Sequence, residues 1–357
     1  MLIMGYLGAV IGAGFASGQE IMQFFVAYGV FGLNGVIIAG SLFAVAGAVL
    51  LYTAHRLKVD SYQNILEYIL GKRMGLLVDF LLAIFLFLGI SMMLSASGAV
   101  FYEHLYLSKN LGIIIAYALI VFLLFTGKKG LIQSYNILVP LKVILLLFIS
   151  GYVGFFVDNP VHGSYTAFLV PQEAKFWIIA SILYVAYNFS LAMVVLTEYQ
   201  SVSTAKNSII GVFIGGLILG LLVLLNFIAL YKFMPMVMHY EVPMLYVAGN
   251  ISITAKNLYT VVLLLGILTT AIANAYGFSQ RFSSFTGIKY EFCLVLCMTL
   301  ALPISMQSFS FLVGKIYPLF GIIGVLILAT LIYKTLKDMG KKVYYNILQL
   351  ISSTKEV

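Results

Sequence analysis

Charged residues are scarce in this sequence. Only 9% of the 357 residues are Asp, Glu, Lys or Arg, whereas 62% are hydrophobic and the mean hydropathy is +1.08. A soluble globular protein carries about 25% charged residues, and no long segment of this chain has that composition. The scarcity excludes a soluble protein or a separate soluble domain. It predicts an all-α polytopic membrane protein.

Cysteine and catalytic clusters are also scarce. Cys293 and Cys297 lie four residues apart in one apolar run, which is neither a disulfide framework nor a metal-site spacing. We expect them to be reduced packing residues. The N-terminus has no basic region and no small-x-small site, so it is not a cleavable signal peptide. No HExxH-type set is present, and the histidines are scattered in or near predicted loops, so we expect no enzyme: His55, His104, His162 and His239.

Long apolar runs are abundant. A helix needs roughly 20 apolar residues to cross the hydrocarbon core of a bilayer. We expect one transmembrane domain over residues 1–333 and a cytoplasmic tail over 334–357, which is either an amphipathic helix on the membrane surface or a solvated segment. Ten spans are predicted, at about 1–28, 30–54, 74–102, 111–126, 135–157, 175–198, 207–232, 253–279, 289–306 and 311–333.

The basic residues test this count of spans. If the N-terminus is cytoplasmic and the spans alternate, the cytoplasmic loops and tail hold 14 of the 20 basic residues and the outside loops hold 5. Cytoplasmic loops are rich in Lys and Arg, and one span more or fewer would destroy this split. We therefore expect a multi-pass protein with both termini cytoplasmic. The net charge of +8 then needs no nucleic acid partner.

The first span contains the sequence GAGFASGQE at residues 12–20. Gly14 and Gly18 form a GxxxG pair, which could serve close helix packing. Alternatively the helix is broken here, because glycine permits non-helical backbone and a cavity, ligand or ion can satisfy the freed groups. N–H groups of such a break suit a carboxylate, and carbonyls suit Na⁺. Gln19 and Glu20 favour the broken helix, since packing alone does not require them.

Further polar residues lie at membrane depth. An inverted repeat of five plus five spans places a second interruption in span six. That span has no glycine, but Tyr187, Asn188 and Ser190 form a polar notch. The notch supports either a break or an interhelical hydrogen bond. In span eight, the hydroxyls of Thr269 and Thr270 either bond their own backbone or offer oxygen atoms to a small cation.

Lys142 is a basic residue within the fifth span. It follows Tyr135 by seven residues, which places it about 10 Å into the helix. Its side chain either extends to the cytoplasmic interface or points into the bundle. In the second case its ammonium group stands where a sodium ion would otherwise sit.

Four segments carry a family resemblance: GAGFASGQEIMQFF in the first span, YVAYNFSLA in the sixth, LTTAIANAYG in the eighth and IYPLFGIIG in the tenth. The chain resembles, over essentially its whole length, the YkvI-like bacterial membrane proteins, relatives of the amino acid–polyamine–organocation transporter superfamily. The resemblance implies a LeuT-type 5+5 inverted repeat with broken helices one and six. Repeat one would cover about 1–157 and repeat two about 175–333. The location implied is the bacterial cytoplasmic membrane.

The resemblance also implies site residues. By this resemblance, residues at the two breaks would bind substrate: Ala13, Gly14, Phe15, Tyr187, Asn188 and Ser190. We add Gly18 and Glu20 of the first break to this set, where Glu20 either caps the second half-helix, binds a substrate amine or relays a proton. A coupling Na⁺ would be held near Val10, Ala13, Thr269 and Thr270, or Lys142 would take its place in a proton-coupled protein, with Glu20 as a second ion-coupling residue. Two features depart from the family pattern. Span six lacks a glycine-rich break, and the chain begins almost at its first span, without a basic leader, which suggests a start within a longer chain.

Two functions follow from these expectations. The first is a secondary active transporter of a small solute, an amino acid or related amine, working by alternating access and coupled to Na⁺ or H⁺. The second is a membrane ligand sensor of germinant-receptor type, with the same fold and no flux. Besides the lipid bilayer and the solute, we expect no partner or cofactor other than Na⁺ as a coupling ion. The residues indicate no oligomeric state.

Overall fold

The computed structural model describes residues 2–125, 129–157, 173–201 and 203–353, and these residues form helices without any strand. Two of the 14 basic residues assigned to the cytoplasmic side, Lys128 and Lys355, lie outside the described residues, as does His162. Within the described part, every predicted span coincides with helical structure.

The first span is divided into three short helices, whereas each later span falls on a single helix. The pieces of the first span are α1 (Leu2–Val10), α2 (Ala13–Ser17) and α3 (Gln19–Phe24). Spans two to ten fall on α4 (Val30–Leu57), α6 (Lys72–His104), α7 (Lys109–Phe125), α8 (Lys129–Phe156), α9 (Trp177–Leu196), α10 (Ala205–Lys232), α12 (Ile253–Thr286), α13 (Tyr290–Ser305) and α14 (Phe309–Ser353).

Length and composition of these helices fit a membrane. Among the described residues, six helices are long and apolar enough to cross a bilayer, namely α4, α6, α9, α10, α12 and α14. Shorter apolar helices cover Lys109–Phe125, Pro140–Phe156 and Tyr290–Ser305. The prediction of a polytopic all-α membrane protein is confirmed.

Helix contacts follow a five-plus-five repeat. Spans three and four, which are α6 and α7, contact each other, and so do spans eight and nine, α12 and α13. In the same way, spans one and five contact through α1 and α8, and spans six and ten through α9 and α14. Equivalent helices of the two repeats also touch each other, as α4 touches α10 and α6 touches α12. This is the pattern that a pseudo-two-fold axis between two repeats produces.

Glycines allow a close approach where α4 crosses α10. A Cβ atom built on Gly40 would lie 3.0 Å from the Cα of Gly220, and one built on Gly220 would lie 2.6 Å from the Cα of Gly40. Any larger side chain would separate the two backbones. The crossing thus uses small residues in the manner common between membrane helices.

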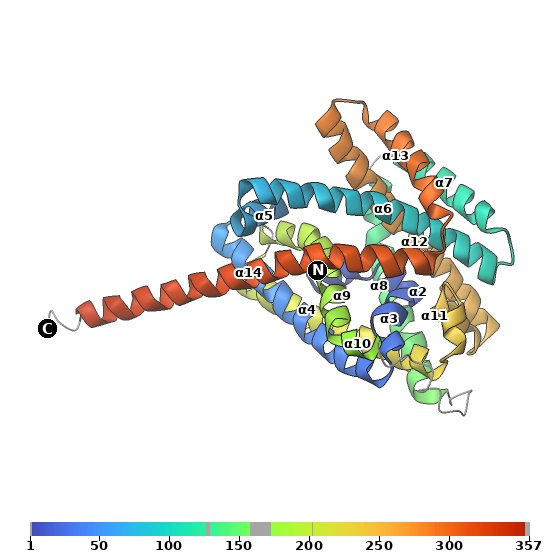
Figure 1. Cartoon of the computed structure of the whole chain (residues 1–357), viewed down its shortest axis with the longest axis horizontal. Helices are drawn as coiled ribbons and strands as arrows, with labels where there is room; N and C mark the ends of the chain where they lie inside the picture. Colours follow the sequence, from blue (N-terminus) through green and yellow to red (C-terminus); the bar gives the residue numbers. More distant parts are fainter. Residues whose placement is uncertain (1, 126–128, 158–172, 202, 354–357) are drawn as a thin grey trace.

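Two short helices lie between spans, and one long helix leaves the bundle. Helix α5 (Tyr62–Leu70) packs on α6, and α11 (Pro243–Gly249) packs on α12. Helix α14 has 45 residues. Figure 1 shows it crossing the molecule and continuing well beyond the other helices toward the C-terminus. Its described tail is therefore a continuation of the tenth span rather than a separate helix.

Candidate functional site

The first span is broken at two points, as predicted from its glycines. Helix α1 ends at Val10, and α2 begins at Ala13, so Ile11 and Gly12 connect them without helical structure. A second interruption lies at Gly18, whose φ of +82° is in the left-handed region that favours glycine. A Cβ atom on Gly18 would also lie 2.6 Å from Met244 Cγ. Both backbone conformation and space therefore require glycine at this position.

Side chains from other helices bond the carbonyl groups that the breaks leave free. Lys142 Nζ in α8 donates to the Ile11 carbonyl at 3.1 Å. The Tyr259 hydroxyl in α12 donates to the Ala16 carbonyl at 2.5 Å. Ser17 supports the second break locally, since its hydroxyl donates to the Gly14 carbonyl at 2.9 Å. The breaks are thus satisfied within the protein, as membrane depth demands.

Lys142 points into the bundle and is buried, with 4% of its surface exposed. It lies against α12 at Gly266, where a Cβ atom would come within 3.2 Å of the lysine Cδ. The hydroxyls of Thr269 and Thr270 both donate to the Gly266 carbonyl, at 3.0 and 2.9 Å. The ammonium group therefore lies between the end of α1 and the two threonines that the sequence proposed as sodium ligands.

Glu20 lies at the start of α3 and is almost completely buried, with 3% exposure. Its carboxyl group folds back over α2, so that a Cβ atom built on Gly14 would lie 2.1 Å from Glu20 Oε1. The side chains of Tyr187 and Asn188 in α9, and of Tyr317 in α14, surround this carboxyl group. The four helices α2, α3, α9 and α14 thus meet at one carboxyl group.

Tyrosine rings form the remaining wall around Glu20. Tyr187 stacks on Tyr317 with ring centroids 4.5 Å apart and an interplanar angle of 15°, and Tyr184 meets Tyr187 edge-on at 5.8 Å. Phe24 packs against Tyr184 and Tyr187. We call Glu20 with Tyr184, Tyr187 and Tyr317 the tyrosine layer.

The tyrosine layer holds polar atoms without partners. Among the described residues, Glu20 Oε2 and the hydroxyls of Tyr184 and Tyr187 are buried and lack a partner with full hydrogen-bond geometry, although the Tyr187 side chain faces the Glu20 carboxyl group. Native proteins leave few buried polar groups unpaired, and each such group needs an explanation. A cluster of three in one layer is typical of a place where a ligand supplies the missing partners.

Helix α9 runs unbroken through the predicted second break, so this prediction is wrong. It is α-helical from Trp177 to Leu196 and then continues as a 3₁₀ turn over Thr197–Ser201. The polar notch bonds its own helix: Asn188 Nδ2 donates to the Tyr184 carbonyl at 3.1 Å, and the Ser190 hydroxyl donates to that of Ala186 at 2.9 Å. Without glycine, these side chains reinforce the helix instead of interrupting it.

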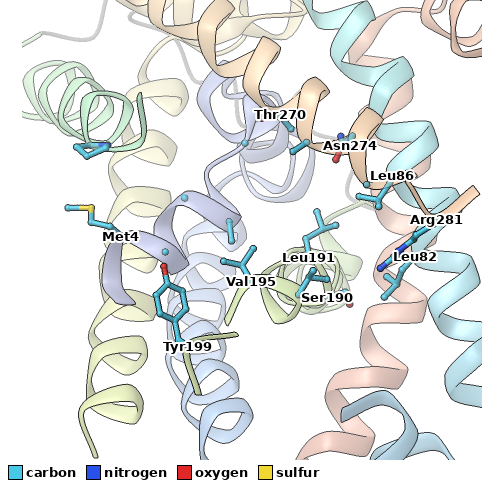
Figure 2. Close-up of a pocket in the computed structure, with 18 residues that line it drawn as sticks. Met4, Leu82, Leu86, Ser190, Leu191, Val195, Tyr199, Thr270, Asn274 and Arg281 are labelled. Carbon is cyan, nitrogen blue, oxygen red and sulfur yellow. The ribbon is translucent and has the colours of Figure 1, made fainter. Parts of the chain in front are cut away.

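A large cavity lies on one side of the tyrosine layer. Its volume is about 730 Å³, and helices α1, α6, α8, α9 and α12 line it. Figure 2 shows Thr270 and Asn274 on one wall and Ser190, Leu191 and Val195 on another. The break residue Gly12 also lines it, so the cavity reaches the interrupted part of the first span.

Arg281 lines the same cavity and connects α12 to α6. Its guanidinium lies 3.4 Å from Asp79, which also accepts a hydrogen bond from the Tyr62 hydroxyl of α5 at 2.5 Å. The Arg281 guanidinium stacks over the Tyr62 ring at 5.3 Å. This cluster joins three elements beside the large cavity.

A small cavity of about 270 Å³ lies on the other side of the layer, lined in part by Phe24, Leu183, Gly314 and Pro318. Neither cavity is lined by a residue of the tyrosine layer itself. On α9, Leu183 lines the small cavity, Tyr187 belongs to the layer and Ser190 lines the large cavity. These residues are four and three positions apart and hence share one helix face.

The first span repeats this order, and the tenth contributes to the layer and to the small cavity. Phe24 lines the small cavity, Glu20 belongs to the layer and Gly12 lines the large cavity. In α14, Tyr317 in the layer directly precedes Pro318 of the small cavity. The first span and α9 thus both place the tyrosine layer between the two cavities.

Ionic contacts tie the elements together at the end of the bundle where α6 ends and α14 begins. Glu103 accepts hydrogen bonds from the backbone N–H of Glu241 and Val242, at 2.6 and 3.2 Å. Glu241 in turn accepts one from the N–H of Phe309 and lies 3.6 Å from Lys109. Burial raises the pKa of Glu241, and the Lys109 ammonium opposes that rise. The network links α6, α7 and α14 to the segment that precedes α11.

The structure brings together part of the predicted substrate set. Gly14, Glu20, Tyr187 and Asn188 meet in or beside the tyrosine layer, whereas Ser190 lines the large cavity. The remaining predicted residues lie elsewhere: Ala13 and Phe15 are buried in α2 and line neither cavity, and Gly18 faces Met244.

Sequence reasoning missed two tyrosines of the layer. Tyr184 precedes the recognised notch of α9 by one helical turn and carried no signal of its own. Tyr317 had one: it directly precedes Pro318 in an apolar helix, and proline removes a backbone donor and weakens the helix there. A polar side chain beside such a position at membrane depth indicates a functional residue.

Comparison with known proteins gives relatives without an assigned function. No protein-family model matches the chain. It is 30% identical to the uncharacterized membrane protein YkvI of Bacillus subtilis over 331 residues, which cover 92% of this chain and 94% of the relative. It is 27% identical to the uncharacterized protein YyaD of the same organism over 330 residues, covering 91% and 94%.

Solved structures give the fold. MhsT in complex with L-phenylalanine matches with a TM-score of 0.59 at 15% identity, covering 94% of this chain and 95% of that chain. A mutant of the Eremococcus coleocola manganese transporter matches at 0.55 and 13% identity, covering 92% and 77%. Mhp1 with bound bromovinylhydantoin, a nucleobase-cation-symport-1 family transporter, matches at 0.54 and 14%, covering 91% and 76%. These neighbours share the LeuT-type fold, in agreement with the expected fold.

Proposed function

The chain belongs to the family of the Bacillus subtilis membrane protein YkvI, and on this premise we propose that it is a secondary active transporter of a small solute, an amino acid or related amine. It works by alternating access in the bacterial cytoplasmic membrane, with both termini on the cytoplasmic side. The observation that carries the proposal is the tyrosine layer between two cavities. A solute bound in that layer is separated from each of the two cavities only by the side chains on that side of the layer.

The orientation assigns the cavities to the two sides. With a cytoplasmic N-terminus, the large cavity lined by α1 and Arg281 faces the cytoplasm, and the small cavity lined by Phe24 and Leu183 faces outward. The network of Glu103 and Glu241 then closes the outer end. Substrate and ion drive the cycle by binding the occluded state better than either open state.

We propose proton coupling through Lys142. Its ammonium group donates to the Ile11 carbonyl, which the break frees and which a coupling Na⁺ would otherwise use. The Val10 carbonyl already accepts the Gly12 N–H at 2.8 Å. Protonated Lys142 thus links α8 to the end of α1, and loss of the proton releases α1, which lines the large cavity.

Uptake into liposomes tests both parts of this proposal. The purified chain is reconstituted and offered a panel of radiolabelled amino acids and amines, with a proton gradient or a Na⁺ gradient as driving force. We expect uptake driven by the proton gradient, and a loss of at least about tenfold in Lys142→Met, because methionine keeps the length but carries no proton. Lys232→Met is the matched control, since Lys232 also bonds carbonyls at the end of α8, at Val153 and Gly154, and that of Val157 directly after it.

Three outcomes would contradict the proposal. Uptake that follows the Na⁺ gradient, or stabilisation of the protein by Na⁺ alone, would overturn the role of Lys142. Equal losses in the two lysine variants would mean that Lys142 acts only in holding helices together. Saturable ligand binding without flux of any solute would overturn the transporter and favour a ligand sensor.

A further inference from the structure

The tyrosine layer holds an acidic side chain that has no basic partner in the ion pairs of the described residues. Glu20 is buried within it, and among the described residues the ion pairs involve other carboxylates: Glu103, Asp338, Glu241 and Asp79. The groups around its carboxyl are the neutral side chains of Tyr187, Asn188 and Tyr317. A buried carboxylate is stable only when it is paired, hydrogen-bonded or protonated. A cationic ligand would complete the pair.

The Glu20 carboxyl also occupies the space next to the helix break. It lies so close to Gly14 that no side chain larger than hydrogen fits there. A substrate that carried its own carboxylate into the layer would bring a second negative charge beside Glu20. Like charges repel strongly where water is excluded, so the layer disfavours an amino acid in its zwitterionic form.

The aromatic rings favour a positive charge. Tyr187 and Tyr317 present a stacked pair, with Tyr184 and Phe24 beside them. Faces of such rings attract ammonium groups. The unpartnered hydroxyls of Tyr184 and Tyr187 and the free Oε2 of Glu20 are acceptors for ammonium N–H groups.

We propose, resting on the transporter function above, that the substrate is an organic amine that carries an ammonium group and no carboxylate, and that Glu20 pairs with this ammonium in the tyrosine layer. Glu20 thus supplies from the protein the carboxylate that an amino acid would have to bring itself. The substrate class is therefore decided by one side chain that folds back on its own broken helix.

Matched pairs of ligands test this inference on the unmodified full chain. Binding of tyramine is compared with that of tyrosine, and binding of phenethylamine with that of phenylalanine, by titration calorimetry of the purified protein in detergent. We expect each amine to bind at least about tenfold more tightly than its parent amino acid. Phenylalanine amide, which keeps the ammonium but has no negative charge, should bind more tightly than phenylalanine.

Variants separate pairing from general stability. Glu20→Gln should weaken amine binding at least about tenfold, and Gly14→Ala should do the same by displacing the carboxyl group. Glu198→Gln is the control. Glu198 is exposed in the turn that follows α9, so this variant should bind amines as the unmodified chain does. A folded Glu20→Gln protein is verified by its thermal midpoint, and the ligand pairs decide the question even without any variant.

The outcomes distinguish this inference from the transporter proposal. Amino acids that bind or are taken up as well as their amines would overturn the amine class and leave the transporter standing. Binding of neither member of any pair, or amine binding unchanged in Glu20→Gln, would also overturn the inference. Amine binding that depends on Glu20, without flux of any solute, would support it and overturn the transporter.

Discussion

The first and sixth spans are equivalent in the two repeats, yet they are built in opposite ways. The first is divided into α1, α2 and α3, whereas the sixth is one helix from Trp177 to Leu196. Both contribute to the tyrosine layer, the first through Glu20 and the sixth through Tyr184 and Tyr187. One span is therefore interrupted and the other is a continuous wall beside the same site.

Hydrogen bonds explain the difference. In the first span, carbonyls freed at Ile11 and Ala16 are bonded by Lys142 and Tyr259 from other helices. In the sixth, Asn188 and other polar side chains bond carbonyls of their own helix. The shape of the first span hence depends on its neighbours, and that of α9 does not.

In the proposed transport cycle the two spans have different parts. Helix α9 lines both cavities, at Leu183 and Ser190, and keeps its shape as a fixed wall. The first span is held at its break by one ammonium group and one hydroxyl group, each of which can be released. We therefore expect the moving element to be the first span.

Gly18→Ala should have the largest effect, because it changes the second break of the first span. Alanine in the left-handed region costs about 1–2 kcal/mol, and its Cβ would overlap Met244, which adds about 1–3 kcal/mol of overpacking. We expect a free energy of unfolding lower by about 2–5 kcal/mol, measured as a lower thermal midpoint.

Gly287→Ala isolates the backbone term of this prediction. Gly287 has a φ of +73° and no atom within 4 Å of its built Cβ. Its substitution should cost only about 1–2 kcal/mol. Equal losses at Gly18 and Gly287 would show that contact with Met244 adds nothing to the need for glycine at the second break.

Tyr259→Phe should have an intermediate effect. It removes the hydroxyl that bonds the freed Ala16 carbonyl, and a lost hydrogen bond of this kind costs about 1–3 kcal/mol when the acceptor stays buried. Because α2 loses a support, we also expect altered uptake in liposomes. Tyr62→Phe removes a hydroxyl bond of the same 2.5 Å length to Asp79, away from the break. If both variants change uptake equally, the Ala16 contact has no special part in transport.

The serine pair Ser17→Ala and Ser190→Ala should give the smallest effects and the most direct comparison of the two spans. Ser17 accepts from the Gln19 N–H at 3.2 Å and donates to Gly14, so its loss leaves the second break unsupported and should cost about 1 kcal/mol. Ser190 bonds only a carbonyl within an intact helix, so its loss should change stability by less than about 0.5 kcal/mol. Thermal midpoints of the two variants measure the difference. A larger loss at Ser190 would contradict the view of α9 as a self-sufficient helix.

Much of the fold could be predicted, and less of the site. Apolar runs located every span, and the glycines at residues 12–20 located the break, because both depend on local composition. Lys142 stood out as a charge within an apolar run, although its length left its direction open. Tyr187 and Asn188 were found as polar residues at membrane depth. Their partner Tyr317 was missed: Pro318 marks the position as unusual within the tenth span, but nothing there relates it to the sixth.

The amino-acid sequence is sufficient to locate the apolar helices, the helix that contains glycine at its breaks, and a glutamate and a lysine within apolar spans. The tertiary structure alone decided that α9 stays continuous, that Lys142 meets Ile11, and that Glu20 folds back on Gly14 among tyrosines of α9 and α14. The physical reason is that backbone preference and hydropathy are properties of neighbours in the chain. Pairing of buried polar groups depends instead on which helices pack together.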